Sequence, residues 1–206
     1  MTSVKMRSVV AGILLAGLFF LPRLGPASRG FSRAELGRLR AGRLVSRPVA
    51  RSGRNLVGGN SWIVVDAPVA EVWRALASPD RYARIWSNVE RVRILSRSAS
   101  QAVVHIRQRV GLATSEFVLR LDFKERSNEV DFRVNRSGDI RDGWGFFRLE
   151  AQGGRTLVAY GAVIDPASGF VRALFEDRLR QRLLGMPTGV KRYVERQYRA
   201  SRGHSG

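Results

Sequence analysis

The alternation of apolar and polar positions is clearest between residues 60 and 95. A short apolar run at residues 61–65 is typical of a β-strand. Two short helical stretches follow this run, and the second of them covers residues 82–86. The first stretch has apolar residues at i, i+3, i+4 and i+7, namely Val69, Val72, Trp73 and Leu76. The pattern therefore predicts a strand, two short helices and the start of another strand.

The middle of the chain alternates with a period of two, which is the period of a β-strand. Turn residues separate the runs, notably Ser127-Asn128 and Gly153-Gly154, and Gly58-Gly59 is read as a further turn before the first strand. Each run has one apolar and one polar face, which indicates an antiparallel sheet with one wet face. The predicted strands are residues 102–110, 117–124, 130–135, 144–151 and 156–164.

The end of the chain has helical spacing. Apolar residues recur between 170 and 179, Gly185 and Pro187 interrupt, and a second stretch continues over 190–198. A small sheet cannot bury its apolar face alone. We therefore expect the long C-terminal helix to lie across the sheet and the two short helices to close one end. The predicted fold class is α+β.

Residues 1–27 have a different character from the domain. Lys5 and Arg7 precede an apolar run at residues 9–21, and small residues follow, which are the parts of a signal peptide. The run is 13 residues long, shorter than the roughly 20 that a membrane-spanning helix needs. We expect cleavage before Ser28 and an exported protein, periplasmic or extracellular. An uncleaved membrane anchor and a misassigned start codon are the open alternatives.

A strong positive charge changes the list of expected partners. The 206 residues include 36 Lys+Arg and 17 Asp+Glu, a formal net charge of +19. The predicted domain covers residues 59–199 and is followed by a flexible tail at 200–206. It is preceded by an Arg-rich lead-in at residues 28–58, which contains a candidate edge strand at 44–50. Peripheral contact with an anionic membrane is one interpretation and a solvated arm is the other. The aromatic residues fall on the apolar faces, which does not favour nucleic acid.

No catalytic constellation is visible in the sequence. The chain has no cysteine, which excludes disulfides, thiolate nucleophiles and Cys-ligated metals. His105 falls on the polar face of a strand and His204 in the tail, and neither has an evident partner for a Ser–His–Asp triad or a metal site. The sequence therefore predicts no catalytic residue, no metal and no cofactor, and it leaves the oligomeric state open.

Several segments follow one another in a characteristic order, namely residues 63–68 with Val72, Trp73, Leu76 and Tyr82, then residues 143–146 and 155–160. This order resembles the START-like, or SRPBCC, superfamily. The resemblance is closest to its polyketide cyclase/dehydrase and coenzyme-Q-binding subgroup, and it covers about residues 59–199. It implies a helix-grip fold, shared with birch-pollen-allergen-like proteins, in which a curved antiparallel sheet of six to seven strands grips a long C-terminal helix. Trp86 departs from the family pattern, which often has a Pro-containing turn there.

The resemblance also implies an apolar ligand, such as a lipid, isoprenoid quinone, polyketide or sterol, in a cavity between sheet and helix. The alternation agrees, because the inward faces are apolar except for Gln108, Thr156 and Tyr160. The predicted cavity residues are Trp86, Gln108, Phe117, Leu119, Phe132, Trp144, Phe146, Tyr160, Val190 and Val194.

Three functions remain open at this point. The first is an exported, non-enzymatic protein that binds or transports a hydrophobic ligand. The second is a polyketide cyclase or aromatase-type enzyme that uses Gln108, Tyr160 and Arg120. The third is a basic adaptor module whose interior is completely filled by its own side chains.

Overall fold

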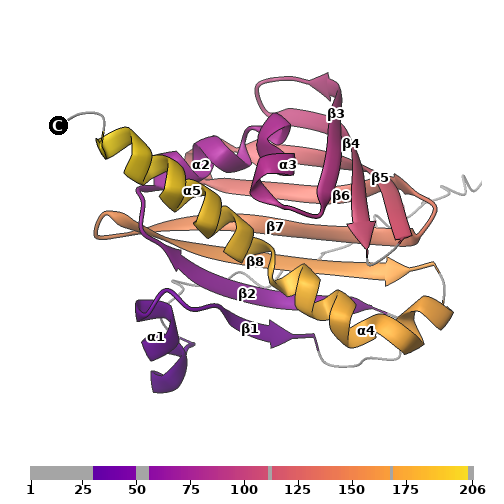
Figure 1. Cartoon of the computed structure of the whole chain (residues 1–206), viewed down its shortest axis with the longest axis horizontal. Helices are drawn as coiled ribbons and strands as arrows, with labels where there is room; N and C mark the ends of the chain where they lie inside the picture. Colours follow the sequence, from indigo (N-terminus) through magenta and orange to yellow (C-terminus); the bar gives the residue numbers. More distant parts are fainter. Residues whose placement is uncertain (1–29, 50–55, 111–112, 168, 204–206) are drawn as a thin grey trace, which may run out of the picture. The chain divides into compact units, whose positions relative to one another are not determined.

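The computed structural model describes residues 30–49, 56–110, 113–167 and 169–203. Within these ranges, residues 110, 113 and 169–176 are described by their backbone alone. Residues 32–206 form one compact unit. The predicted leader, residues 1–27, lies entirely outside the described residues. The elements of the unit (Figure 1) are α1 (Arg33–Arg40), β1 (Val45–Pro48), β2 (Val57–Val65), α2 (Val69–Leu76), η1 (Pro79–Arg81), α3 (Tyr82–Ile85), β3 (Val89–Arg97), β4 (Gln101–Val110), β5 (Ala113–Lys124), η2 (Glu125–Ser127), β6 (Glu129–Ser137), β7 (Ile140–Gln152), β8 (Arg155–Pro166), α4 (Gly169–Leu184) and α5 (Met186–Gly203).

An eight-stranded antiparallel sheet organises this unit. Its strand order is β1-β2-β8-β7-β6-β5-β4-β3, so β3 to β8 follow one another as a meander and β2 pairs with β8. The predicted α+β fold class is confirmed. The sheet has more strands than the six to seven predicted, and the candidate edge strand in the Arg-rich lead-in is one of them, because β1 pairs with β2.

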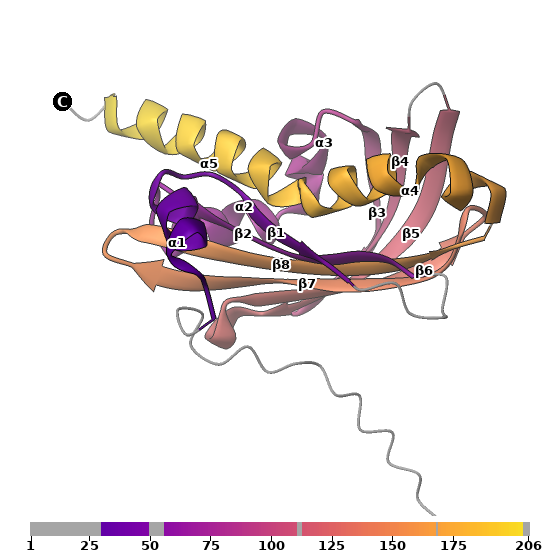
Figure 2. The same ribbon diagram turned by 90° about the horizontal axis from the view of Figure 1, so that it is seen from below.

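Helices α2, α3, α4 and α5 lie on one face of the sheet, which we call the inner face (Figure 2). The C-terminal helix is broken, since α4 ends at Leu184 and α5 begins at Met186. The interruption predicted at Gly185 is thus confirmed. Helix α4 contacts β2 and β8, and α5 contacts β2, β8, α2 and α3. None of the helices in the described part of the chain is both long and apolar enough to cross a membrane.

Gly58 and Gly59 lie inside β2, so the turn predicted there is wrong. Their φ angles of 155° and 150° belong to a region that only glycine adopts readily. A Cβ atom at Gly58 would also overlap the backbone carbonyl of Ala162 in β8. These glycines therefore allow close approach between strands. The turn predicted at Gly153-Gly154 is confirmed, with φ angles of 55° and 82°.

The middle of α5 is fixed to the first long strand by two side chains. The Lys191 Nζ donates to the carbonyl oxygen of Val64 at 2.9 Å and also pairs with Glu195. The Glu195 Oε1 accepts a hydrogen bond from the backbone N–H of Asp66 at 2.8 Å. Both side chains are largely buried, so this ion pair is less screened than one on the surface. The contacts hold α5 in place over the end of β2.

Candidate functional site

The inner face of the sheet has two ends of different character. Under α2 and α3 its apolar side chains are buried, as are Val190 and Val194 of α5, which pack against them. On β3, β5 and β6 some of the apolar side chains are only half-buried, although their neighbours on β4 are buried. Five of them define what we call the inner patch: Val92 of β3, Phe117 and Leu119 of β5, and Phe132 and Val134 of β6.

The strand register makes the inner patch continuous. Val92 stands opposite Ile106 of β4, which stands opposite Phe117. Leu119 stands opposite Val134 in the next pair of strands. Directly opposed residues of an antiparallel pair share one face of the sheet. The inner patch is therefore an apolar surface that crosses β3 to β6, and solvent reaches part of it.

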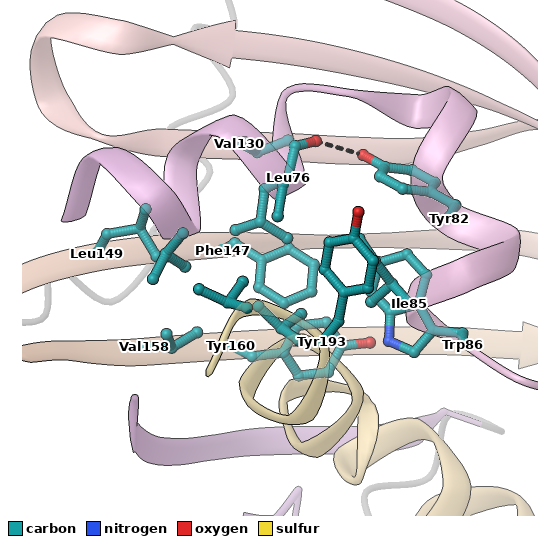
Figure 3. Close-up of a cluster of buried hydrophobic side chains, with 14 of the residues drawn as sticks. Leu76, Tyr82, Ile85, Trp86, Val130, Phe147, Leu149, Val158, Tyr160 and Tyr193 are labelled. Carbon is teal, nitrogen blue, oxygen red and sulfur yellow. Dashed lines mark hydrogen bonds between the residues drawn. The ribbon is translucent and has the colours of Figure 1, made fainter. Parts of the chain in front are cut away.

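An aromatic cluster separates the inner patch from the packed core. The ring of Phe132 stacks on Tyr160 with 6.0 Å between centroids, and Tyr160 lies 4.7 Å from Phe147. Phe147 stacks in turn on Trp86 at 6.3 Å. The rings of Trp86, Phe147 and Tyr160 gather with Tyr193 of α5 between the sheet and the helix (Figure 3). Aromatic pairs contribute about 0.5–1.5 kcal/mol beyond their buried area, so these contacts stabilise the border of the inner patch, which we call the wall.

Trp86 connects this wall to the junction of α4 and α5. Its indole N–H donates to the carbonyl oxygen of Met186 at 2.9 Å. A Cβ atom at Gly189 would lie 2.6 Å from Cδ1 of the indole, so α5 approaches the ring where the helix has no side chain. The predicted site residue Trp86 is thus buried, and its polar group is used within the protein.

Two of the predicted inward polar groups have partners in the protein. The Gln108 Oε1 accepts a hydrogen bond from Asn88 Nδ2 at 3.2 Å. The Thr156 hydroxyl donates to the carbonyl oxygen of Ala67 at 2.7 Å. Thr156 therefore fixes the start of α2 to β8, and its hydroxyl is already occupied.

Two other inner-face hydroxyls are different. Ser61 of β2 is completely buried and Tyr160 of β8 is 2% exposed. The Ser61 Oγ is buried without a hydrogen-bond partner among the described residues. The Tyr160 hydroxyl makes no hydrogen bond with any residue that the structure describes. Burial raises the pKa of the Tyr160 hydroxyl well above its ordinary value. Tyr160 is therefore a neutral hydroxyl at any working pH.

Two predicted cavity residues, Trp144 and Phe146, lie on the opposite face of the sheet. In β7, Phe147 and Leu149 point to the inner face, so the alternate residues of the strand point away from α5. The ring of Phe146 instead contacts the guanidinium of Arg148 at 4.4 Å. The assignment of these two aromatic residues to the cavity is corrected, because strand register and not side-chain size determines the face.

The other eight predicted residues stand on the inner face or on elements that cover it. They are Trp86, Gln108, Phe117, Leu119, Phe132, Tyr160, Val190 and Val194. Sequence reasoning missed Val92 and Ser61. The alternation of Ser61 with Ile63 was a signal for its inward direction, but no pattern in the sequence indicates that its hydroxyl lacks a partner.

The candidate enzymatic residues are not brought together. Arg120 lies on the outer face, 3.3 Å from the carboxylate of Asp122. Gln108 and Tyr160 belong to β4 and β8, with three strands between them. Among the described residues there is no group of three or more potential metal ligands.

A family model matches most of this unit. Residues 65–188, more than half of the chain, match the family described as polyketide cyclase / dehydrase and lipid transport. Among curated protein sequences no match is found.

Solved structures share the fold at low sequence identity. The Zhui aromatase/cyclase from Streptomyces sp. R1128 has a TM-score of 0.62 and 20% identity, covering 71% of this chain and 98% of its own. A STAR-related lipid transfer protein fragment from Xanthomonas axonopodis has a TM-score of 0.63 and 12% identity, covering 73% and 93%. A START superfamily protein from Mycobacterium smegmatis has 0.59 and 12%, covering 69% and 98%. At these identities the likeness concerns the fold alone.

Proposed function

The chain belongs to the polyketide cyclase / dehydrase and lipid transport family, and on that basis we propose that it binds a hydrophobic ligand without catalysis. The ligand lies on the inner patch, between the sheet and the junction of α4 and α5. Binding is driven by removal of apolar surface from water, roughly 25 cal/mol per Å². The protein collects or carries this ligand and does not transform it.

One observation carries the proposal. The inner patch is apolar and half-exposed although it lies on the same face as the fully buried core. Phe117, Leu119 and Phe132 pack against that core on one side only. On the helical side, Leu183 and Met186 are also half-buried. Apolar surface that a folded protein leaves accessible beside its core is typical of a ligand-binding site.

The first test measures binding of N-phenyl-1-naphthylamine, a neutral apolar probe that fluoresces when it leaves water. We expect the wild-type protein to bind the probe, and Leu119→Asn to weaken binding about tenfold, a loss of about 1.4 kcal/mol. The matched control is Val118→Thr, which introduces a polar group at the next position of β5. Val118 stands opposite His105, on the outer face. Equal loss in both variants, or no binding by the wild type, would contradict the proposal.

We also propose that the helical layer brings the protein to anionic membranes. Arg178, Arg182, Arg192 and Arg196 are exposed on α4 and α5, and none has an acidic partner among the described residues. Each basic residue near an anionic lipid surface contributes about 1 kcal/mol to binding. The same helices meet at the junction beside the inner patch, so this orientation would bring the ligand site close to its lipid source.

Vesicle co-sedimentation tests this orientation. We expect binding to vesicles of phosphatidylglycerol and phosphatidylcholine in low salt, and no binding to phosphatidylcholine alone. The double variant Arg192→Glu/Arg196→Glu should bind at least tenfold more weakly, from the loss of two attractive charges. Arg91→Glu/Arg93→Glu changes the net charge equally, on exposed residues of β3. The same loss in both double variants would mean that total charge, and not the helical face, determines binding.

A further inference from the structure

The hydroxyls of Ser61 and Tyr160 stand out because their hydrogen-bonding capacity is unused. Ser61 is 0% exposed and Tyr160 is 2% exposed. The Ser61 Oγ is a buried atom without a hydrogen-bond partner among the described residues. The Tyr160 hydroxyl makes no hydrogen bond with a described residue, and burial is the one cause that raises its pKa. Leaving a buried hydroxyl unpaired is costly, and native proteins rarely do so without a reason such as a bound water or ligand. Thr156, on the same strand as Tyr160, has its hydroxyl bonded to Ala67.

Ser61 and Tyr160 are paired on the inner face of the sheet. Ser61 of β2 stands directly opposite Tyr160 of β8, so both side chains leave the sheet on the same side. The next inner-face pair along these strands is Gly59 and Ala162, which carry almost no side chain. The Tyr160 ring stacks on Phe132, which belongs to the inner patch. The paired residues therefore border the inner patch on its β2–β8 side.

The residues around Ser61 and Tyr160 determine which kind of ligand group could form hydrogen bonds with the two hydroxyls. The inner-facing residues that neighbour the pair on β7 and β8 are apolar, namely Phe147, Gly145 and Ala162. Both hydroxyls are neutral, and each donates one hydrogen bond and accepts others. A carboxylate or phosphate would lose its hydration at this place without gaining a cation, which is costly. An alcohol or carbonyl oxygen needs only the hydrogen bonds that these hydroxyls offer.

We propose that Ser61 and Tyr160 form a polar subsite that binds the neutral oxygen atoms of an otherwise apolar ligand. The ligand class is a long-chain or polycyclic alcohol, ketone or quinone, and not a free fatty acid or a phospholipid headgroup. This inference rests on the proposed function, because it requires an apolar ligand on the inner patch.

The test compares three chains of equal length on the full protein: dodecan-1-ol, dodecanoate at pH 8, and 1-fluorododecane, which has no oxygen. Affinity is measured by displacement of N-phenyl-1-naphthylamine. We expect the wild type to bind dodecan-1-ol at least tenfold more tightly than dodecanoate. Ser61→Ala and Tyr160→Phe should each weaken dodecan-1-ol binding about five- to tenfold, from the loss of one hydrogen bond. Their affinity for 1-fluorododecane should stay unchanged.

Thermal denaturation separates this role from a structural one. Ser61→Ala and Tyr160→Phe remove unpaired hydroxyls, so their melting temperatures should be unchanged or higher. The matched control is Thr156→Val, which removes a paired hydroxyl and should melt lower while keeping the preference for dodecan-1-ol. Lower melting of both test variants with unchanged affinity for dodecan-1-ol would overturn the inference, since the hydroxyls would then hold only internal water. If the wild type binds neither the fluorescent probe nor dodecan-1-ol, the proposed function itself fails.

Discussion

Replacing Trp86 with alanine is expected to lower the free energy of unfolding by about 3–5 kcal/mol. The indole is buried between α3, Phe147 and the start of α5. Its removal leaves a cavity beside Tyr82, whose ring contacts the indole edge-to-face at 4.9 Å. It also removes the hydrogen bond that the indole donates to Met186. Urea denaturation followed by far-UV circular dichroism measures the effect.

Two control variants divide the expected loss. Trp86→Phe keeps an aromatic ring in the cluster and removes the N–H, so it should cost clearly less than the alanine variant. Trp144→Ala removes a tryptophan from the outer face of the same sheet, where the side chain is half-buried, and should cost about 1 kcal/mol. Equal destabilisation by Trp86→Ala and Trp144→Ala would contradict the central role that the structure gives to Trp86.

Gly145→Ala is expected to destabilise the protein by about 3 kcal/mol and to abolish binding of N-phenyl-1-naphthylamine. Gly145 stands opposite Phe132 in the pairing of β6 and β7. A Cβ atom at this position would overlap both the ring of Phe132 and the backbone carbonyl of Gly161. The ring can move, but the carbonyl belongs to the ladder of β7 and β8 and cannot move without breaking it. A displaced Phe132 would change the inner patch and its stack on Tyr160.

Gly138→Ala is the matched control for this variant. Gly138 lies between β6 and β7, and nothing stands within 4 Å of the position that its Cβ atom would occupy. Its free energy of unfolding and its probe binding should stay within error of the wild type. If Gly145→Ala is as stable as Gly138→Ala, the close contact between Phe132 and the backbone of β7 does not exist in solution.

The periodic parts of the fold were predictable from the sequence. Strict alternation gave the strands from β4 to β8, and helical spacing gave α2 and the broken C-terminal helix. The glycines of β2 were misread, because a pair of glycines marks a turn and a close strand contact equally well. Gly58 and Gly59 differ from Gly153 and Gly154 in φ and in what a Cβ atom would meet, and neither property is visible in the sequence.

The site was predictable only where it follows from alternation. Phe117, Leu119 and Phe132 alternate with charged or exposed neighbours, so their inward direction could be derived. Trp144 and Phe146 were assigned by size, and register places them on the other face. The hydrogen bond from Trp86 to Met186 joins residues 100 positions apart in the chain. Such a contact depends on tertiary structure, which no local pattern encodes.

The position of β2 in the sheet determines how the protein can fold. Strands β3 to β8 can pair successively as each hairpin is completed, because every strand neighbours the next one in the chain. Strand β2, which precedes this meander in the chain, pairs with β8, the last strand, and α5 contacts both. Contacts of such long sequence separation require a large loop to close before they form, which slows folding. The chain can therefore complete its sheet only after nearly all of it has been synthesised, and until then β2 has no partner in the meander.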